Sequence, residues 1–355
     1  MPDVDVLVAG GGPVGLAAAI EARLAGLSVM VVEPRPAPID KACGEGLMPG
    51  AVHALARLGV EPPGRAFAGI TYSDGRRSVS HRFALGPGLG VRRTVLHDAL
   101  TKRAADLGVV VMAARVAQVE SSRYGVTVRT TPAANGMSSQ ATAPLHGSWL
   151  LACDGLHSDV RRLLGLAQPV AAARRFGMRR HFRVEPWSEF VEVHWTPHAE
   201  IYVTPVADDE IGVAVLGARG LDYGSVIDEA PAVQRRIASA EPVSPLRGAG
   251  PLLQRTSRRT AGRVLLAGDA SGYVDALTGE GIRLGLAQAG AAVEAIVTGR
   301  ADRYERAWRR LTRDYRVLTS ALVGAAERPA LRRRIVPLAS RLPRLYGAIV
   351  DRLAD

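Results

Sequence analysis

Hydrophobic and polar positions along this chain follow two different periods, and each change of period marks a predicted element. Near the N-terminus, Val4, Val6 and Val8 alternate with other residues, which is typical of a short buried strand. Residues 16–24 then carry apolar side chains at helical spacing, and residues 29–32 form a second apolar run. The chain is therefore predicted to begin with a strand–helix–strand unit.

The same reasoning predicts further elements up to about residue 155. Helices are expected over residues 49–58 and from Arg93 to near Gly108. Residues 70–83 alternate around Asp74-Gly75, which is a strong signal for a hairpin turn. Strands are predicted at 109–112, 116–119, 126–129 and 149–153, with a polar hairpin tip over 132–147.

The pattern changes between about residues 174 and 253, where alternation with a period of two residues predominates. Stretches 190–195, 200–205 and 211–216 predict an antiparallel sheet inserted into the first domain. After the insertion, residues 263–269 are predicted to form a buried strand ending in Asp269, and a helix should run from Gly279-Glu280-Gly281 to about Thr298.

Three glycines follow the first predicted strand at G-x-G-x-x-G spacing, namely Gly10, Gly12 and Gly15. The first permits a tight turn, the second lets the backbone approach a pyrophosphate, and the third lets helix and strand pack closely. The helix N-terminus then faces the phosphates, and Glu33 ends the second strand where it can accept hydrogen bonds from a ribose. This unit predicts dinucleotide binding without choosing between NAD and FAD.

Composition narrows the class of protein. The 355 residues are 47% hydrophobic and 22% charged, which suits a globular protein of one large or two modest domains. No apolar run is long enough to span a membrane, and residues 1–9 show no secretory signal, so we expect a cytoplasmic protein. Cys43 and Cys153 are the two cysteines and imply no disulfide framework, and the histidines lack metal-ligand spacing.

The net charge is +11 and comes almost entirely from arginine, because Lys41 and Lys102 are the only lysines. Such a balance can indicate nucleic acid or an anionic membrane as a partner. No nucleic-acid motif accompanies it, so we expect no nucleic-acid partner and interpret most of the charge as a solvated surface.

Two stretches could contribute to a ligand site. The glycine-rich loop over residues 37–49 contains Cys43, which is either a small buried residue or a thiol close to a ligand. In the predicted sheet, aromatic and histidine side chains could line a pocket, although ordinary strand packing is favoured for each one. These residues are His194, Trp195, His198 and Tyr202.

Three motifs in this order, GGGPVG, CDGLHSDVR and GDASGYVDALTGEGI, resemble the FAD-dependent oxidoreductases of the aromatic hydroxylase and geranylgeranyl reductase group. The resemblance covers residues 3–325, and the loop KACGEGL resembles the geranylgeranyl reductase branch. It implies an α/β fold with a Rossmann-like FAD-binding domain of the glutathione-reductase and p-hydroxybenzoate-hydroxylase type and an inserted antiparallel substrate domain. The expected FAD domain comprises 1–70, 91–170 and 256–325, the substrate domain 71–90 and 171–255, and a helical tail 326–355.

The resemblance also implies a set of FAD contacts. Gly10, Gly12, Gly15 and Glu33 match positions that hold the ADP half of the cofactor. The remaining cofactor-binding candidates match other motif positions or adjoin them, and Cys43 is the catalytic candidate. Those candidates are Pro13, Arg35, Gly44, Arg93, Val116 (against adenine), Asp154 and Gly155 (a motif associated with FAD and NAD(P)H), Asp269 (on the sugar-alcohol chain), Gly279, Gly281 and Ile282.

Three functions remain open. The favoured one is NAD(P)H-dependent hydroxylation of a hydrophobic phenolic or polyketide-like small molecule. The second is reduction of an isolated double bond in an isoprenoid-like substrate, which KACGEGL favours. The third is a non-catalytic lipid-binding protein, which the acids Glu33, Asp154 and Asp269 argue against. Because only one nucleotide-binding unit is visible, NAD(P)H is expected to be a transient reductant.

The tail, residues 329–355, interleaves arginines with aliphatic residues. Pro337 and Pro343 are expected to break it into short helical pieces. A basic amphipathic segment can lie on an anionic membrane, so peripheral membrane contact is one expectation. Packing of the tail on the flavin domain is the favoured alternative.

Overall fold

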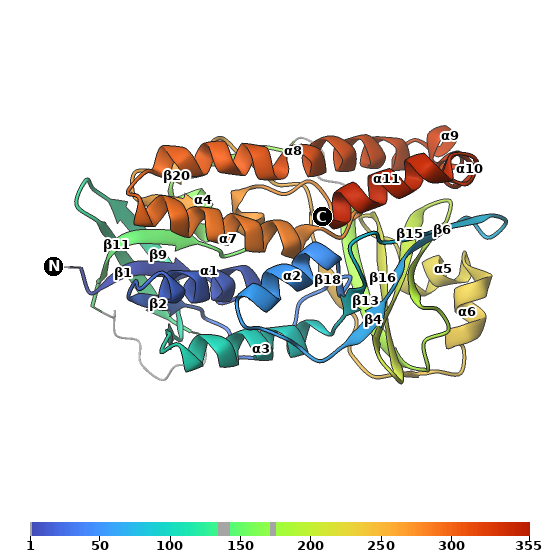
Figure 1. The fold of residues 1–355 in the computed structure, drawn as a ribbon, viewed down its shortest axis with the longest axis horizontal. Coiled ribbons are helices and arrows are strands. Elements are labelled where there is room, and N and C mark those ends of the chain that lie inside the picture. Colours follow the sequence, from blue (N-terminus) through green and yellow to red (C-terminus); the bar gives the residue numbers. More distant parts are fainter. Residues whose placement is uncertain (1, 134–142, 171–174) are drawn as a thin grey trace.

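The computed structural model describes residues 2–133, 143–170 and 175–355. Two large sheets lie side by side, and the long helices α7 (Gly281–Val297) and α8 (Ala301–Ala326) run along one side of the molecule (Figure 1). The first sheet lies near the N-terminus and the second at the opposite end. No helix among the described residues is long and apolar enough to cross a membrane.

The first sheet contains the predicted strand–helix–strand unit. Its strand order is β20-β21-β11-β1-β2-β8, and β1 is parallel to both β2 and β11, as a dinucleotide-binding unit requires. The carboxyl ends of these parallel strands therefore meet at one edge. The strands are β1 (Val4–Ala9), β2 (Val29–Val32), β8 (Val110–Met112), β11 (Leu145–Ala152), β20 (Thr260–Ala261) and β21 (Val264–Leu266).

A hairpin of β9 (Ala114–Ser121) and β10 (Val126–Pro132) continues from β11. With α4 (Asp159–Leu163), it covers one face of this sheet, where Val116 and Val128 pack against Leu7 and Leu150. The strand β11 begins at Leu145, four residues earlier than predicted. The predicted hairpin tip falls mainly on residues 134–142, outside the described part of the chain.

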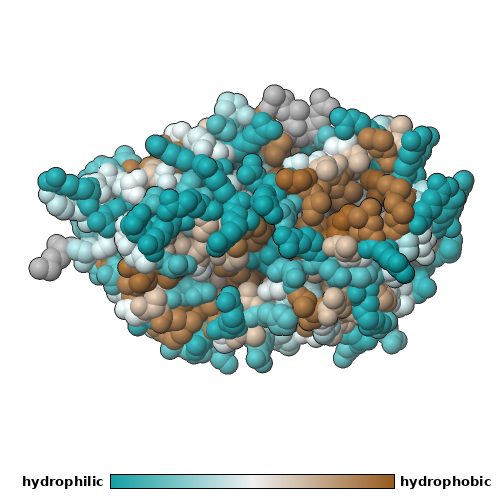
Figure 2. Space-filling view, turned by 45° about the horizontal axis from the view of Figure 1, so that its top comes forward, coloured by the Kyte–Doolittle hydropathy of each residue, from teal (hydrophilic) through white to brown (hydrophobic). Residues whose placement is uncertain are grey.

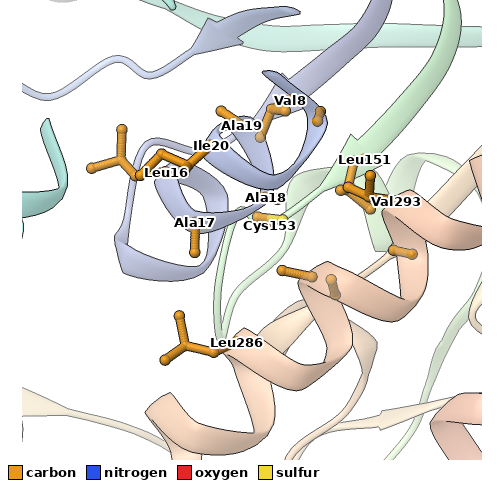
Figure 3. Close-up of a cluster of buried hydrophobic side chains, with 14 of the residues drawn as sticks. Val8, Leu16, Ala17, Ala18, Ala19, Ile20, Leu151, Cys153, Leu286 and Val293 are labelled. Carbon is orange, nitrogen blue, oxygen red and sulfur yellow. The ribbon is translucent and has the colours of Figure 1, made fainter. Parts of the chain in front are cut away.

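Helices cover the opposite face of the first sheet. Helix α1 (Pro13–Leu24) packs between the sheet and α7, and Figure 3 shows Ala18 and Cys153 beside Leu151 in this core. Burial raises the pKa of the Cys153 thiol, so this cysteine serves as an apolar core residue. Helices α2 (Pro49–Arg57) and α3 (Arg93–Asp106) complete the layer and match their predicted ranges.

The second sheet has the order β17-β13-β16-β15-β14-β5-β6, with β18 also paired to β13. It is antiparallel except where β14 runs parallel to β5. Helices α5 (Tyr223–Asp228) and α6 (Pro231–Ile237) pack on one face. The strands are β5 (Gly69–Ser73), β6 (Ser78–Arg82), β13 (Arg175–Arg183), β14 (Phe190–Trp195), β15 (Ala199–Ala207), β16 (Glu210–Ala218), β17 (Glu241–Pro242) and β18 (Arg247–Ala249).

Short elements join the two large sheets. One of them is a three-stranded sheet of β3 (Gly46–Leu47), β7 (Gly88–Gly90) and β4 (Arg65–Phe67). Along the chain, β3 and β4 lie between β2 and β5, and β7 lies between β6 and β8. Strands β12 (Ala167–Gln168) and β19 (Arg255–Thr256) form a separate pair, and a 3-10 turn spans Gly268–Ser271.

The tail forms α9 (Pro329–Arg332), α10 (Ile335–Arg341) and α11 (Pro343–Ala354). It packs mainly against the second sheet rather than the flavin domain, because Arg332 donates to Glu200 Oε1 at 2.6 Å and Tyr346 to Ile70 O at 3.2 Å. Pro343 begins a new helix as predicted. Pro337 does not break one, because it lies in the first turn of α10, where a backbone N–H has no helical partner.

Candidate functional site

A single continuous cavity of about 920 Å³ extends from the carboxyl edge of the first sheet to the inner face of the second sheet and the tail. All but one of the site residues predicted from the sequence line it, although they come from distant parts of the chain. The lining residues are Gly10, Gly12, Pro13, Glu33, Arg35, Cys43, Gly44, Arg93, Val116, Asp154, Gly155, Asp269, Gly279, Gly281 and Ile282. The exception is Gly15.

The three glycines of the first loop have different surroundings. A Cβ on Gly15 would lie 1.8 Å from Gly10 O, and Gly10 has a φ of +96°. These two glycines are therefore required by the loop and its contact with α1. A Cβ on Gly12 would meet only Arg93 Nη2, at 3.7 Å, so Gly12 leaves open space on the cavity side.

Glu33 is an ionised acid at the end of β2. Its Oε2 accepts a hydrogen bond from Gly11 N at 2.8 Å, and its Oε1 accepts one from Arg35 Nε at 2.8 Å. Burial opposes ionisation, but Arg35 outweighs it and holds the pKa of Glu33 below its usual value. A carboxylate oxygen can accept more than one hydrogen bond, so Glu33 can still bind a ribose hydroxyl.

Arg93, the first residue of α3, supplies a cation beside the glycine loop. Its Nε is buried and has no hydrogen-bond partner among the described residues, and burial lowers its pKa although Cys43 and Asp269 act in the opposite direction. A buried guanidinium without a bonded anion is costly. The diphosphate of FAD would provide the missing anion.

Two further acids, Asp154 and Asp269, line the cavity. Asp154 Oδ2 accepts from Val160 N at 3.0 Å, whereas its buried Oδ1 has no partner among the described residues, and burial raises the pKa of this carboxyl. Asp269 Oδ2 lies 3.5 Å from Lys41 Nζ. The orphaned atoms of Arg93 and Asp154 and the open space at Gly12 together fit FAD, whose isoalloxazine ring supplies redox chemistry when it is bound.

The loop that contains Cys43 is fixed by contacts that the sequence did not predict. Cys43 Sγ accepts a hydrogen bond from Glu45 N at 3.4 Å, and Gly44 O accepts one from Thr204 Oγ1 at 2.8 Å. Glu45 is buried with a φ of +60°, and its Oε2 lies 2.6 Å from His181 Nε2. The charged residues of β13 were the one sequence signal for these contacts. Their partners, such as Glu45 for His181, lie too far away in the sequence to be identified from residue spacing.

The far end of the cavity is apolar. Tyr72 and Tyr202 are its main polar residues on the second sheet, and Tyr202 donates to Leu277 O at 2.7 Å. Of the four sheet residues considered from the sequence, only Tyr202 lines the cavity. His194 bonds Glu192, His198 bonds Glu229, and Trp195 packs against Tyr72. The aliphatic lining residues include Val191, Val193, Leu216, Leu322, Leu338, Leu342, Leu345 and Ile349.

Comparison with known proteins identifies the family. The sequence pattern of the FAD binding domain matches residues 3–222, which is more than half of the chain. The chain belongs to this family. The flavoprotein is 28% identical to dialkyldecalin synthase from Streptomyces rugosporus over 307 residues, which cover 80% of this chain and 63% of that protein. The match to the FAD binding domain identifies FAD as the cofactor of the family.

Other relatives are oxidoreductases. The flavoprotein is 28% identical to menaquinone reductase from Mycolicibacterium smegmatis over 352 residues, covering 88% of this chain and 80% of that protein. It is also 28% identical to rifampicin monooxygenase from Streptomyces venezuelae over 309 residues, covering 80% of this chain and 62% of that protein. The chain thus spans less than two thirds of two of these three relatives.

A solved structure shows the same fold. A triple mutant of the flavin-dependent brominase Bmp2 superimposes with a TM-score of 0.84, covering 99% of this chain and 94% of that one at 18% identity. At this identity the likeness establishes the arrangement of the two sheets and the helices only.

Proposed function

We propose that this flavoprotein uses FAD and NAD(P)H to hydroxylate a hydrophobic phenolic or polyketide-like molecule. The observation that carries the proposal is the single cavity, in which the cofactor cradle of Gly12, Glu33 and Arg93 opens directly into an apolar chamber. A substrate in that chamber would lie against the cofactor with water excluded by aliphatic side chains. The rifampicin monooxygenase relative supports this reaction class.

Tyr72 is the residue best placed to orient such a substrate. Its hydroxyl has no hydrogen-bond partner among the described residues, and it lines the apolar part of the cavity. Burial, together with the charge of Glu200, raises its pKa, so the hydroxyl stays protonated. A neutral hydroxyl can donate a hydrogen bond to a phenol or carbonyl oxygen of the substrate.

Reduction of an isolated double bond is the second candidate. Cys43 lines the cavity in the KACGEGL loop, and its thiol could supply the proton that accompanies hydride transfer. The menaquinone reductase relative, of which the chain covers 80%, also supports a reductase. A non-catalytic lipid-binding role is disfavoured, because the buried unpaired groups of Arg93 and Asp154 suit a bound cofactor rather than a lipid.

Product analysis with and without oxygen tests these candidates. The purified holoprotein is incubated with NADH or NADPH and either an alkylated phenol or a polyprenyl chain, and products are identified by mass spectrometry. Hydroxylation should add one oxygen atom and stop under nitrogen. Addition of two hydrogen atoms in both atmospheres would favour the reductase instead. A colourless protein that binds the probes without turnover would contradict both redox functions. Bleaching of the flavin absorbance by NADH or by NADPH identifies the reductant.

A further inference from the structure

The cavity opens to the surface between helices of the tail. Leu338, Leu342, Leu345 and Ile349, which we call the apolar mouth, all line the cavity and are 37–56% exposed. Figure 2 shows a hydrophobic patch ringed by hydrophilic residues on the face that carries the C-terminal helices. A large contiguous apolar patch rimmed by polar residues often marks an interaction site.

Packing within the fold does not account for the apolar mouth. The tail is already fixed through other side chains, because Val336, Tyr346 and Val350 are buried and Arg332 bonds Glu200. The buried and exposed aliphatic residues occupy different sides of α10 and α11. These helices therefore present one apolar surface to the sheet and a second one to the cavity entrance and solvent.

Positive charge accompanies the apolar mouth. Arg333, Arg334, Arg341 and Arg344 are exposed, and none of them forms an ion pair with a described residue. Residues 328–350 contain no Asp or Glu. Arginines elsewhere are often paired, as Arg300 and Arg306 are with Asp302. Exposed aliphatic residues interleaved with unpaired arginines are typical of segments that lie on an anionic bilayer.

We propose that the apolar mouth and these four arginines form a docking surface for an anionic lipid bilayer. The aliphatic side chains would enter the boundary between headgroups and acyl chains, and the guanidinium groups would bind lipid phosphates. The cavity entrance would then face the membrane, so a long-chain substrate could pass from the bilayer to the cavity without crossing water. Docking does not depend on the reaction, whereas this substrate route rests on the proposed function.

Vesicle sedimentation tests the docking surface. The full-length holoprotein is mixed with vesicles of phosphatidylcholine alone or with added phosphatidylglycerol. We expect binding to the anionic vesicles that weakens with salt, and little binding to the neutral ones. The double variant Arg341→Gln/Arg344→Gln should weaken binding about 10- to 30-fold. Leu338→Ser/Leu345→Ser should weaken it about tenfold or more.

Matched variants control for charge and for folding. Arg303→Gln/Arg310→Gln removes the same charge from exposed positions of α8 and should leave vesicle binding within about twofold. Flavin content and thermal unfolding of each variant show that its fold is retained. Equal binding by the leucine variant and the unchanged protein, or no binding to anionic vesicles, would overturn the proposal. So would a dimer that the leucine substitutions convert to a monomer while vesicles have no effect, because the occupant would then be a second copy.

Discussion

The Oε2 atom of Glu45 lies 2.6 Å from Nε2 of His181, and both side chains are buried where the loop that contains Cys43 meets β13. Glu45 Oε1 also accepts a hydrogen bond from the backbone N of Arg93 at 2.9 Å. One carboxylate thus joins the Cys43 loop, the start of α3 and the second sheet. We infer that Glu45 positions Cys43 and Arg93, which both line the cavity.

Replacing Glu45 by Gln keeps the side-chain volume and removes the charge. Arg179 Nη2 lies 3.6 Å from Glu45 Oε1 and would lose part of its compensation. We expect the free energy of unfolding in urea to fall by about 3 kcal/mol, and FAD to bind about tenfold more weakly because Arg93 is displaced. Glu120→Gln, at an exposed position without an ion pair to a described residue, is the control. Unchanged FAD affinity in Glu45→Gln would show that Glu45 has only a structural role.

Gly12→Val should abolish FAD binding and spare the fold. Gly12 has a φ of −70° and a ψ of 177°, which valine can adopt, and its Cβ would point into open space. The added methyl groups would occupy the volume needed by the diphosphate. We expect at least about a 100-fold loss of FAD affinity, or about 3 kcal/mol, measured by fluorescence titration of the deflavinated protein.

Gly15→Val provides the contrast to Gly12→Val. Its Cβ would lie 1.8 Å from Gly10 O, so the variant should fail to fold rather than lose FAD selectively. Full flavin content in Gly12→Val would remove Gly12 from the cofactor site.

Cys43→Ser separates a chemical role of the thiol from simple packing. The serine hydroxyl nearly preserves size but ionises far less readily than a thiol. We expect retained FAD, an altered flavin absorbance spectrum and a turnover number lower by about 100-fold if Cys43 supplies a proton. Cys153→Ala, which lies in the core and also borders the cavity, should lower stability. If both turnover and spectrum of Cys43→Ser match the unchanged protein, Cys43 is a packing residue.

Glu280 makes stability depend on pH. Burial raises its pKa to about 7 from an ordinary value of 4.5, although Arg283 acts in the opposite direction. The stability gained by keeping this carboxyl protonated is complete below about pH 4.5 and is lost as pH rises through about 7. The free energy of unfolding should therefore fall by about 3 kcal/mol between these values through this residue. Gln does not titrate, so Glu280→Gln should show a flatter profile in urea titrations, and an unchanged profile would contradict the assignment.

The sequence alone determined the elements whose signals are local. The glycine spacing after β1, the apolar residues at helical spacing in α1 and the Asp74-Gly75 turn each specify the backbone of a few neighbouring residues. The sequence could therefore predict that Gly12, Glu33 and Asp154 lie close together. They follow strands whose carboxyl ends share one edge of a parallel sheet.

Only the tertiary structure decided which distant side chains meet. The strand β13 reads RFGMRRHFR and gave no clear strand signal, because its buried Arg175, Arg179 and His181 are compensated by acids far away in sequence. Glu45 and His181 are 136 residues apart, and Arg332 and Glu200 are 132 apart. The sequence likewise showed that the tail is amphipathic but not which face is packed, because that depends on where the second sheet and α8 leave apolar surface uncovered.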